Sequence, residues 1–140
     1  MDPVLSPRLA ALVAALPLRP DSHVLEIGCG PGAAARAVAA RLTTGRILAI
    51  DRSAAAIRRA ESAGADAIAA GRLRVRCVAA EDFVLDPGEP RFDLVFAARV
   101  GALDGRHPAL GAMVLRRLAA CTTPDARLFV DGSEHLVPRA

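Results

Sequence analysis

A glycine-rich turn between a short apolar segment and an alanine-rich segment constrains this chain more than any other feature. It reads Val-Leu-Glu-Ile-Gly-Cys-Gly-Pro-Gly over residues 24–32. Glycine allows the backbone to turn tightly and allows a ligand to approach it closely. A helix that begins at such a turn offers backbone N–H groups that have no partner within the helix. The pattern is typical of a nucleotide-binding turn at the carboxyl edge of a parallel sheet.

Short apolar segments alternate with amphipathic segments along the rest of the chain. We expect strands at residues 23–27, 46–50, 73–78, 92–97 and 127–131, and helices at residues 3–16, 32–42, 53–68 and 107–120. This alternation predicts a parallel sheet that is covered on both faces. The expected fold is a three-layer α/β/α sandwich with a doubly wound sheet of about five strands, in the order 3-2-1-4-5. Residues 1–140 are expected to form a single domain.

Composition narrows the class of protein further. Hydrophobic residues make up 53% of the chain, which predicts a packed core and excludes a disordered protein. The net charge of +3 comes from scattered arginines, and aromatic residues make up only 3%, so a nucleic-acid partner is not expected. The three cysteines have no paired spacing, which favours reduced thiols in a cytoplasmic protein without a metal site. Neither a signal peptide nor a membrane span is expected.

The glycine turn also carries two features that separate one class of nucleotide site from another. Gly28, Gly30 and Ala33 satisfy the dinucleotide pattern, but Glu26 and Pro31 oppose a nicotinamide-dependent oxidoreductase. An acidic residue followed by G-x-G-x-G resembles motif I of the class I S-adenosylmethionine-dependent methyltransferases. Residues 46–51, 91–97 and 127–131 resemble the second, fourth and fifth strands of that family. The resemblance covers roughly residues 5 to 132.

The resemblance implies roles for particular residues. Gly28, Gly30 and Gly32 would line the methionine and ribose parts of S-adenosylmethionine, Glu26 would meet the methionine ammonium, and Asp51 would accept from the ribose hydroxyls. Asp51 lies 23 residues after Gly28, where a ribose partner is also expected from spacing alone. The family's acidic residue near the adenine falls at Ala79 here, so Glu81 or Asp82 is expected to replace it. The full predicted cofactor set is Glu26, Gly28, Cys29, Gly30, Gly32, Asp51, Arg52, Glu81, Asp82 and Ala97.

Residues that act on a methyl acceptor are harder to identify. Methyl transfer mainly requires alignment and exclusion of water, so the catalytic residues remain unknown. Arg99 and His107 are weak candidates, for holding an acidic acceptor and for acting as a base, but surface pairing and helix capping are open alternatives. Asp104 is expected in a turn, His23 at a strand edge, and Cys29 as a small filler. Glu134 and His135 would reach the site only if the tail folds back.

The predicted function is methyl transfer from S-adenosylmethionine to a small-molecule acceptor, with S-adenosylhomocysteine as product. The Asn/Asp-Pro-Pro-aromatic signature of amino-group nucleic-acid methyltransferases is absent, which disfavours that substrate class. The sheet is expected to end after strand five, without the family's C-terminal antiparallel hairpin. An uncovered strand-five edge favours a homodimer or a partner protein. The alternative is therefore a non-catalytic or partner-dependent cofactor-binding subunit.

Overall fold

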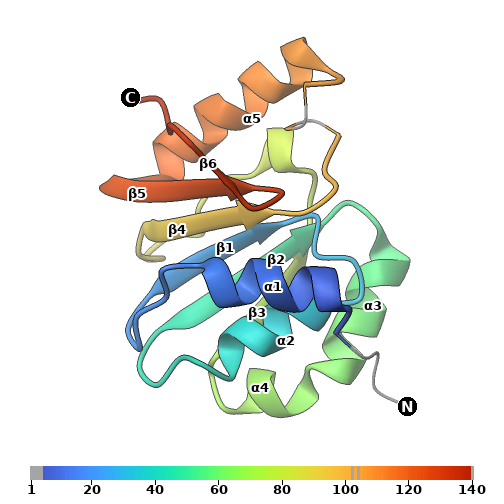
Figure 1. Cartoon of the computed structure of the whole chain (residues 1–140). Coiled ribbons are helices and arrows are strands. Elements are labelled where there is room, and N and C mark those ends of the chain that lie inside the picture. The colour runs from blue at the N-terminus through green and yellow to red at the C-terminus, as the bar shows by residue number, and fades with distance from the viewer. Residues whose placement is uncertain (1–4, 102, 104, 140) are drawn as a thin grey trace.

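The computed structural model describes residues 5–101, 103 and 105–139. Its centre is a six-stranded sheet in the order β3-β2-β1-β4-β5-β6 (Figure 1). The parallel strands are β1 (His23–Ile27), β2 (Arg46–Asp51), β3 (Leu73–Cys77), β4 (Phe92–Ala97) and β5 (Thr122–Val130). The predicted order 3-2-1-4-5 is confirmed. β6 (Ser133–His135) pairs antiparallel with β5.

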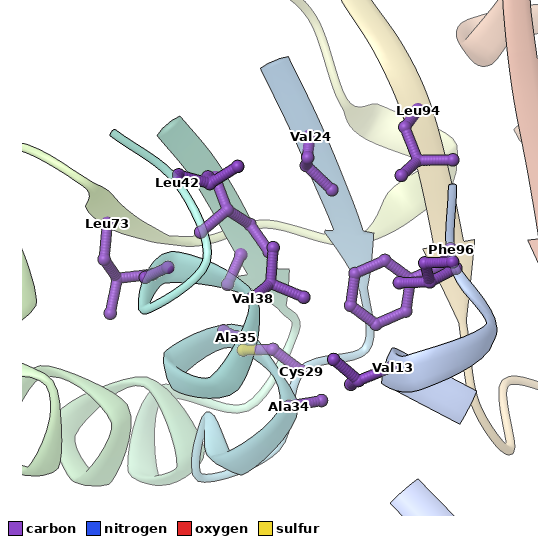
Figure 2. Packing of buried hydrophobic residues seen from close by; sticks show 14 of the residues in the cluster. Val13, Val24, Cys29, Ala34, Ala35, Val38, Leu42, Leu73, Leu94 and Phe96 are labelled. Carbon is purple, nitrogen blue, oxygen red and sulfur yellow. The ribbon is translucent and has the colours of Figure 1, made fainter. Parts of the chain in front are cut away.

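Alternate residues of the strands face two separate cores, because successive side chains of a strand point to opposite faces. Val24, Leu73, Leu94 and other residues pack under α1 (Pro7–Ala15), α2 (Ala33–Ala39) and α3 (Ala54–Ala63), and Figure 2 shows part of this cluster. The other face packs under α5 (Pro108–Cys121) and the short helix η1 (Ala80–Asp82). The result is the expected three-layer sandwich.

Helix boundaries follow local chemistry. Ser6 caps α1 by accepting the N–H of Leu9 at 3.2 Å, and Ser53 caps α3 by accepting the N–H of Ala56 at 3.1 Å. The predicted helix over residues 53–68 is wrong as one element, since it breaks at Gly64 into α3 and α4 (Ala65–Ala69). A Cβ at Gly64 would lie 2.6 Å from Leu73 Cδ2, so close packing on β3 requires glycine at the break.

The structure has a sixth strand that the sequence did not predict, since the sheet was expected to end after strand five. Residues 133–135 pair with residues 128–130, and Asp131 and Gly132 form the connection with φ of 50° and 86°. A two-residue turn with both φ positive matches the right-handed twist of a hairpin, and Asp-Gly is a preferred sequence for it. The last three residues of β5 are therefore paired with β6, and the expected uncovered edge is confined to the earlier residues of β5.

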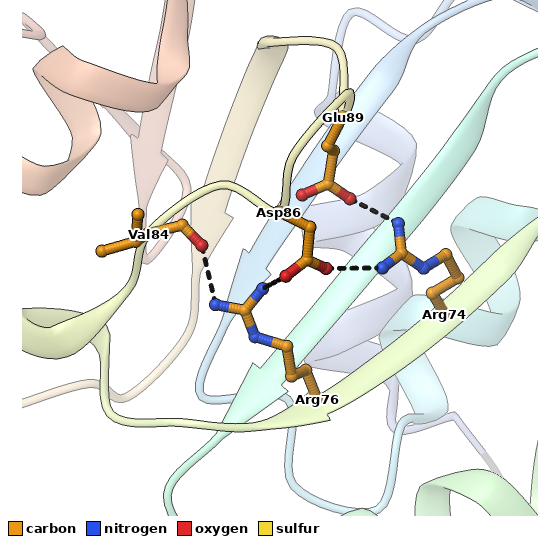
Figure 3. A network of polar contacts seen from close by, with 5 residues as sticks. All are labelled: Arg74, Arg76, Val84, Asp86 and Glu89. Atoms are coloured by element: carbon orange, nitrogen blue, oxygen red, sulfur yellow. Dashed lines mark hydrogen bonds and ion pairs between the residues drawn. The ribbon is translucent and has the colours of Figure 1, made fainter.

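The connection from β3 to β4 is fixed by a network of arginines and carboxylates (Figure 3). Arg74 pairs with Asp86 and Glu89, and Arg76 pairs with Asp86 and donates to the carbonyl of Val84. Both arginines lie on β3, at an edge of the sheet, so the loop over residues 84–89 is held against that edge. Charged side chains along an edge strand also oppose pairing with another chain.

Candidate functional site

The glycine turn, residues 28–32, is held against the end of β2 by backbone hydrogen bonds. The N–H groups of Gly28 and Cys29 both donate to the carbonyl oxygen of Ile50, at 2.8 and 3.0 Å. Gly28 has φ of 69° and Gly30 has φ of 54°, a region that side chains disfavour. A Cβ at Gly28 would lie 2.7 Å from Val100 Cγ2, whereas one at Gly30 would meet nothing within 4 Å. Gly30 therefore leaves open space for a ligand.

Asp51, at the end of β2, ties the turn to the next helix. Its Oδ2 accepts the N–H of Gly30 at 2.9 Å, and its Oδ1 accepts the N–H of Ser53 at 2.8 Å. A carboxylate oxygen can accept two hydrogen bonds, so each oxygen keeps acceptor capacity for a ligand. Asp51 thus orders the turn and still presents an acceptor at the carboxyl edge of the sheet.

Two adjoining cavities flank the turn and share Gly28 and Arg99. The larger cavity has a volume of about 360 Å³ and the smaller about 300 Å³. Pockets of this size accept small molecules. The larger cavity is lined by Ile27, Gly28, Ile50, Asp51, Arg52, Val78, Ala79, Ala80, Glu81, Arg99, Val100, Gly101, His107 and Leu110. The smaller is lined by Ser6, Arg8, Leu9, Glu26, Gly28, Cys29, Gly30, Pro31, Ala33, Ala34, Ala98 and Arg99.

Glu26 is the most unusual group of the smaller cavity. It is 3% exposed, and its Oε1 has no hydrogen-bond partner within the described residues. Burial, with a further contribution from the negative charge of Asp51, raises the pKa of Glu26 to about 8. Such an unsatisfied acceptor costs free energy in a buried position. Its presence next to the glycine turn points to a cationic ligand group that supplies the missing partner.

Cys29 lies beside Glu26 but has different chemistry. Burial raises the pKa of its thiol to about 12, with smaller contributions from Glu26 and Asp51. Its Sγ lies 3.4 Å from the carbonyl oxygen of Gly30. A thiol with so high a pKa is a poor nucleophile. The side chain therefore lines the turn as a small apolar group.

The two acidic candidates for the adenine end lie differently. Glu81 lines the larger cavity, is 16% exposed, and pairs with Arg52 at 3.1 Å. Its Oε2 is buried without a partner among the residues described. Asp82 is exposed and is not part of either cavity lining. Ala97 is buried at the end of β4 and is not part of either cavity lining, and its carbonyl accepts the N–H of Asp131 at 3.0 Å.

Arg99 and His107 both reach the larger cavity, on the loop between β4 and α5. Arg99 is exposed, has φ of 56°, and donates its N–H to Asp131 Oδ1 at 2.8 Å. His107 is exposed and occupies the position before α5 without a side-chain capping bond. Both side chains are therefore accessible to a bound molecule. Asp104 lies outside the described residues.

The other histidines and the tail lie away from the two cavities. His23 is at the opposite end of β1, where its ring stacks on Phe92 at 4.7 Å and burial lowers its pKa. Glu134 of β6 is paired with Arg127, which lowers the pKa of that carboxyl. His135 lines a separate cavity of about 330 Å³, next to α5. The tail therefore folds back onto β5 but not over the glycine turn.

Several lining residues were missed by sequence reasoning. Residues 78–80 and, apart from the predicted Arg99, residues 98–101 follow β3 and β4, and the meeting of parallel strand ends at one edge was a signal that could have identified them. Arg8 and Leu9 come from α1 and Ser6 is its N-cap, and no local pattern connects that helix to the site. Within the described part of the chain, His, Cys, Asp and Glu form no group of three that could hold a metal ion. In the same residues, no helix is long and apolar enough to cross a membrane.

Comparisons with known structures place this architecture among methyltransferase folds. A methyltransferase from Thiobacillus denitrificans, crystallised with S-adenosylhomocysteine, aligns at TM-score 0.69 and 22% identity over 93% of this chain and 50% of its own. Coclaurine N-methyltransferase, bound to N-methylheliamine and S-adenosylhomocysteine, aligns at TM-score 0.69 and 18% identity over 87% of this chain and 34% of its own. The [4+2]-cyclase SpnF aligns at TM-score 0.69 and 22% identity over 87% of this chain and 42% of its own.

These similarities show the fold, and the chain spans half or less of the length of each of the three structures. No curated protein matches the sequence. A family model described as a methyltransferase domain matches residues 24–125, which include all but the first residue of β1, its glycine turn and the beginning of β5. The chain belongs to this methyltransferase domain family.

Proposed function

We propose that the chain binds S-adenosylmethionine and transfers its methyl group to a small-molecule acceptor, with S-adenosylhomocysteine as product. The observation that carries this proposal is Glu26, a buried carboxyl whose Oε1 has no partner among the described residues and which lines the smaller cavity. The ammonium of the cofactor's amino-acid end is a cation that fits it. The open space at Gly30 fits the same end of the molecule.

The larger cavity suits the adenosine part. Asp51 retains acceptor capacity for the two ribose hydroxyls, and apolar side chains of Ile50 and Val78 line a surface for the adenine ring. Glu81, with its partnerless Oε2, is the acidic group available to the adenine amino group. Oxidoreductases bind their dinucleotides at a similar turn, but the partnerless acceptor Oε1 of Glu26 suits an ammonium donor better than a pyrophosphate, whose oxygens are themselves acceptors.

The bound cofactor supplies a methyl group already activated by a positively charged sulfur. The chain's own residues then have to align the acceptor and exclude water. His107 could take a proton from a hydroxyl or ammonium acceptor, since it is exposed and lines the larger cavity. The two cavities, of about 360 and 300 Å³, are of a size that binds a small molecule such as the cofactor.

The test is calorimetric titration of the full chain with S-adenosylhomocysteine and, separately, with NAD. Asp51→Asn removes the charge that faces the ribose, and Asp82→Asn is its matched control outside the cavity linings. We expect binding of S-adenosylhomocysteine but not NAD. Asp51→Asn should weaken binding by roughly ten-fold or more, because a hydrogen bond to a charged group contributes about 1.5–3 kcal/mol. Equal weakening by Asp82→Asn, or tight NAD binding, would contradict the proposal.

A second candidate is a cofactor-binding subunit that depends on a partner for its acceptor site. It is favoured by the exposure of Arg99 and His107, which leaves the candidate reacting region open to water. The [4+2]-cyclase SpnF shares this fold, so the architecture is compatible with other reactions. Binding of S-adenosylhomocysteine without methyl transfer to any small-molecule acceptor in a screen would favour this candidate.

We also propose a cytoplasmic location and a homodimer for the single domain of residues 1–140. The three cysteines are free, which supports a reducing compartment. β6 has only three residues and leaves the earlier part of β5 without a strand neighbour on that side, which supports pairing with a second copy. Sedimentation equilibrium tests the dimer, and a monomer at all concentrations would refute it.

A further inference from the structure

Two arginines from distant parts of the chain line the smaller cavity. Arg8 comes from α1, and Arg99 comes from the loop after β4. The guanidinium of Arg99 forms no ion pair or hydrogen bond within the described part of the chain. The lining also contains the buried carboxyl of Glu26. The smaller cavity therefore combines two cationic groups with one carboxyl group.

Asp131 contacts both arginines although it lines neither cavity. Its Oδ1 accepts the backbone N–H of Arg99 at 2.8 Å and lies 3.7 Å from the guanidinium of Arg8. Asp131 is itself fixed, because its N–H donates to the carbonyl of Ala97 at 3.0 Å. A single carboxylate thus links the β5–β6 turn to the two cationic residues.

The backbone of Arg99 needs this support. Its φ of 56° is uncommon for a residue with a side chain, because the left-handed region brings Cβ close to the following carbonyl oxygen. The bond from Asp131 stabilises that conformation, which directs the loop past both cavities. The neighbouring Gly132 packs on α1, since a Cβ there would lie 2.9 Å from Leu12 Cδ2. The hairpin therefore positions the helix that carries Arg8 as well as the loop that carries Arg99.

We propose that Asp131 is a positioning residue that holds Arg8 and Arg99 to bind the carboxylate at the amino-acid end of the cofactor. This inference rests on the proposed function. That end of S-adenosylmethionine is a zwitterion, and Glu26 offers an acceptor for its ammonium. Arg8, Arg99 and Asp131 together carry one net positive charge, which matches one carboxylate. Arginine is well suited to this role because its guanidinium can donate two parallel hydrogen bonds to a carboxylate.

The test compares S-adenosylhomocysteine with methylthioadenosine, which lacks the amino-acid end. Both are titrated calorimetrically into the wild-type chain, Asp131→Ala, Asp131→Asn and Arg99→Gln. Asp131→Ala and Arg99→Gln should each weaken the binding of S-adenosylhomocysteine about ten-fold. The affinity for methylthioadenosine should stay within about two-fold of the wild-type value. Asp131→Asn keeps an acceptor oxygen and tolerates positive φ, so it should retain part of the affinity. When Arg99 is already replaced by glutamine, Asp131→Ala should lower the affinity for S-adenosylhomocysteine by a smaller factor than it does in the wild-type chain.

Equal weakening of both ligands would overturn the inference, because it would show a general distortion of the cavities. Additive effects of Asp131→Ala and Arg99→Gln would also overturn it. If Asp131→Ala fails to fold, Asp131→Asn and Arg99→Gln carry the same comparison of the two ligands. A folded wild-type chain that binds neither ligand refutes the proposed function and this inference with it. If Arg99→Gln lowers methyl transfer to an acceptor while both ligands bind unchanged, the inference is also overturned and Arg99 is assigned to the acceptor instead.

Discussion

Replacing Glu26 by glutamine should stabilise the fold at alkaline pH and, at the same time, weaken the binding of the cofactor. Glutamine has nearly the same size but no charge. Burial, with the charge of Asp51 as a smaller cause, raises the pKa of Glu26 from 4.5 to about 8. The unfolded chain therefore ionises at lower pH than the folded chain, and rising pH favours unfolding.

The magnitude follows from the two pKa values. Below about pH 4.5 both states hold the proton, and above about pH 8 neither does, so the effect develops between these limits. Each pH unit in that window should lower the free energy of unfolding by about 1.4 kcal/mol, giving a total of about 5 kcal/mol. Glu26→Gln removes this loss, so the variant should become progressively more stable than the wild type as pH rises.

Urea unfolding measured by far-ultraviolet circular dichroism provides the assay, since the chain has no tryptophan. Wild type, Glu26→Gln and the exposed control Asp82→Asn are compared at several values between pH 5 and pH 8. The difference between wild type and Glu26→Gln should grow with pH, and Asp82→Asn should follow the wild type. Parallel pH curves for wild type and Glu26→Gln would refute the reasoning. At pH 8, Glu26→Gln should also bind S-adenosylhomocysteine less tightly, because the ammonium loses a charged partner.

Two further predictions concern the glycine turn and the cysteines. Gly28→Ala should lower both thermal stability and cofactor affinity more than Gly30→Ala, since both have positive φ but only the Gly28 Cβ would meet a neighbour, at 2.7 Å; equal melting temperatures and affinities would contradict this. Iodoacetamide at pH 8 should label the exposed Cys77 and spare Cys29 and Cys121, whose burial raises their thiol pKa to about 12, and mass spectrometry of the folded chain would detect any exception.

Much of the fold could be predicted because its signals are local. β1, β2 and β4 are short aliphatic segments that end in the turn chemistry of the carboxyl edge, and the structure places them as expected. β6 was not predicted: Asp131-Gly132 is a strong hairpin sequence, but the strand that follows it has only three residues, Ser133–His135. The break at Gly64 depends on packing against Leu73, which no helical pattern reveals.

Sequence position likewise indicated some residues of the candidate site, whereas others are brought together only by packing. Glu26, the turn glycines and Asp51 lie in or just after strands, so their sequence positions indicated a shared edge of the sheet. Arg8 and Asp131 are near opposite ends of the chain, and only the packing of α1 on the β5–β6 turn brings them to 3.7 Å. The low solvent exposure of Glu26 likewise depends on the whole fold, and sequence spacing gave no measure of its pKa.

The most direct test of the central claim is a titration of the isotopically labelled chain with S-adenosylhomocysteine, followed by amide NMR. The account predicts that chemical shifts move at the glycine turn of residues 28–32, at Asp51 and at residues 78–81, which line the two cavities. Resonances near His23, at the opposite end of β1, should stay in place. Shifts centred on that opposite end, or no shifts at saturating ligand in a folded chain, would contradict the account.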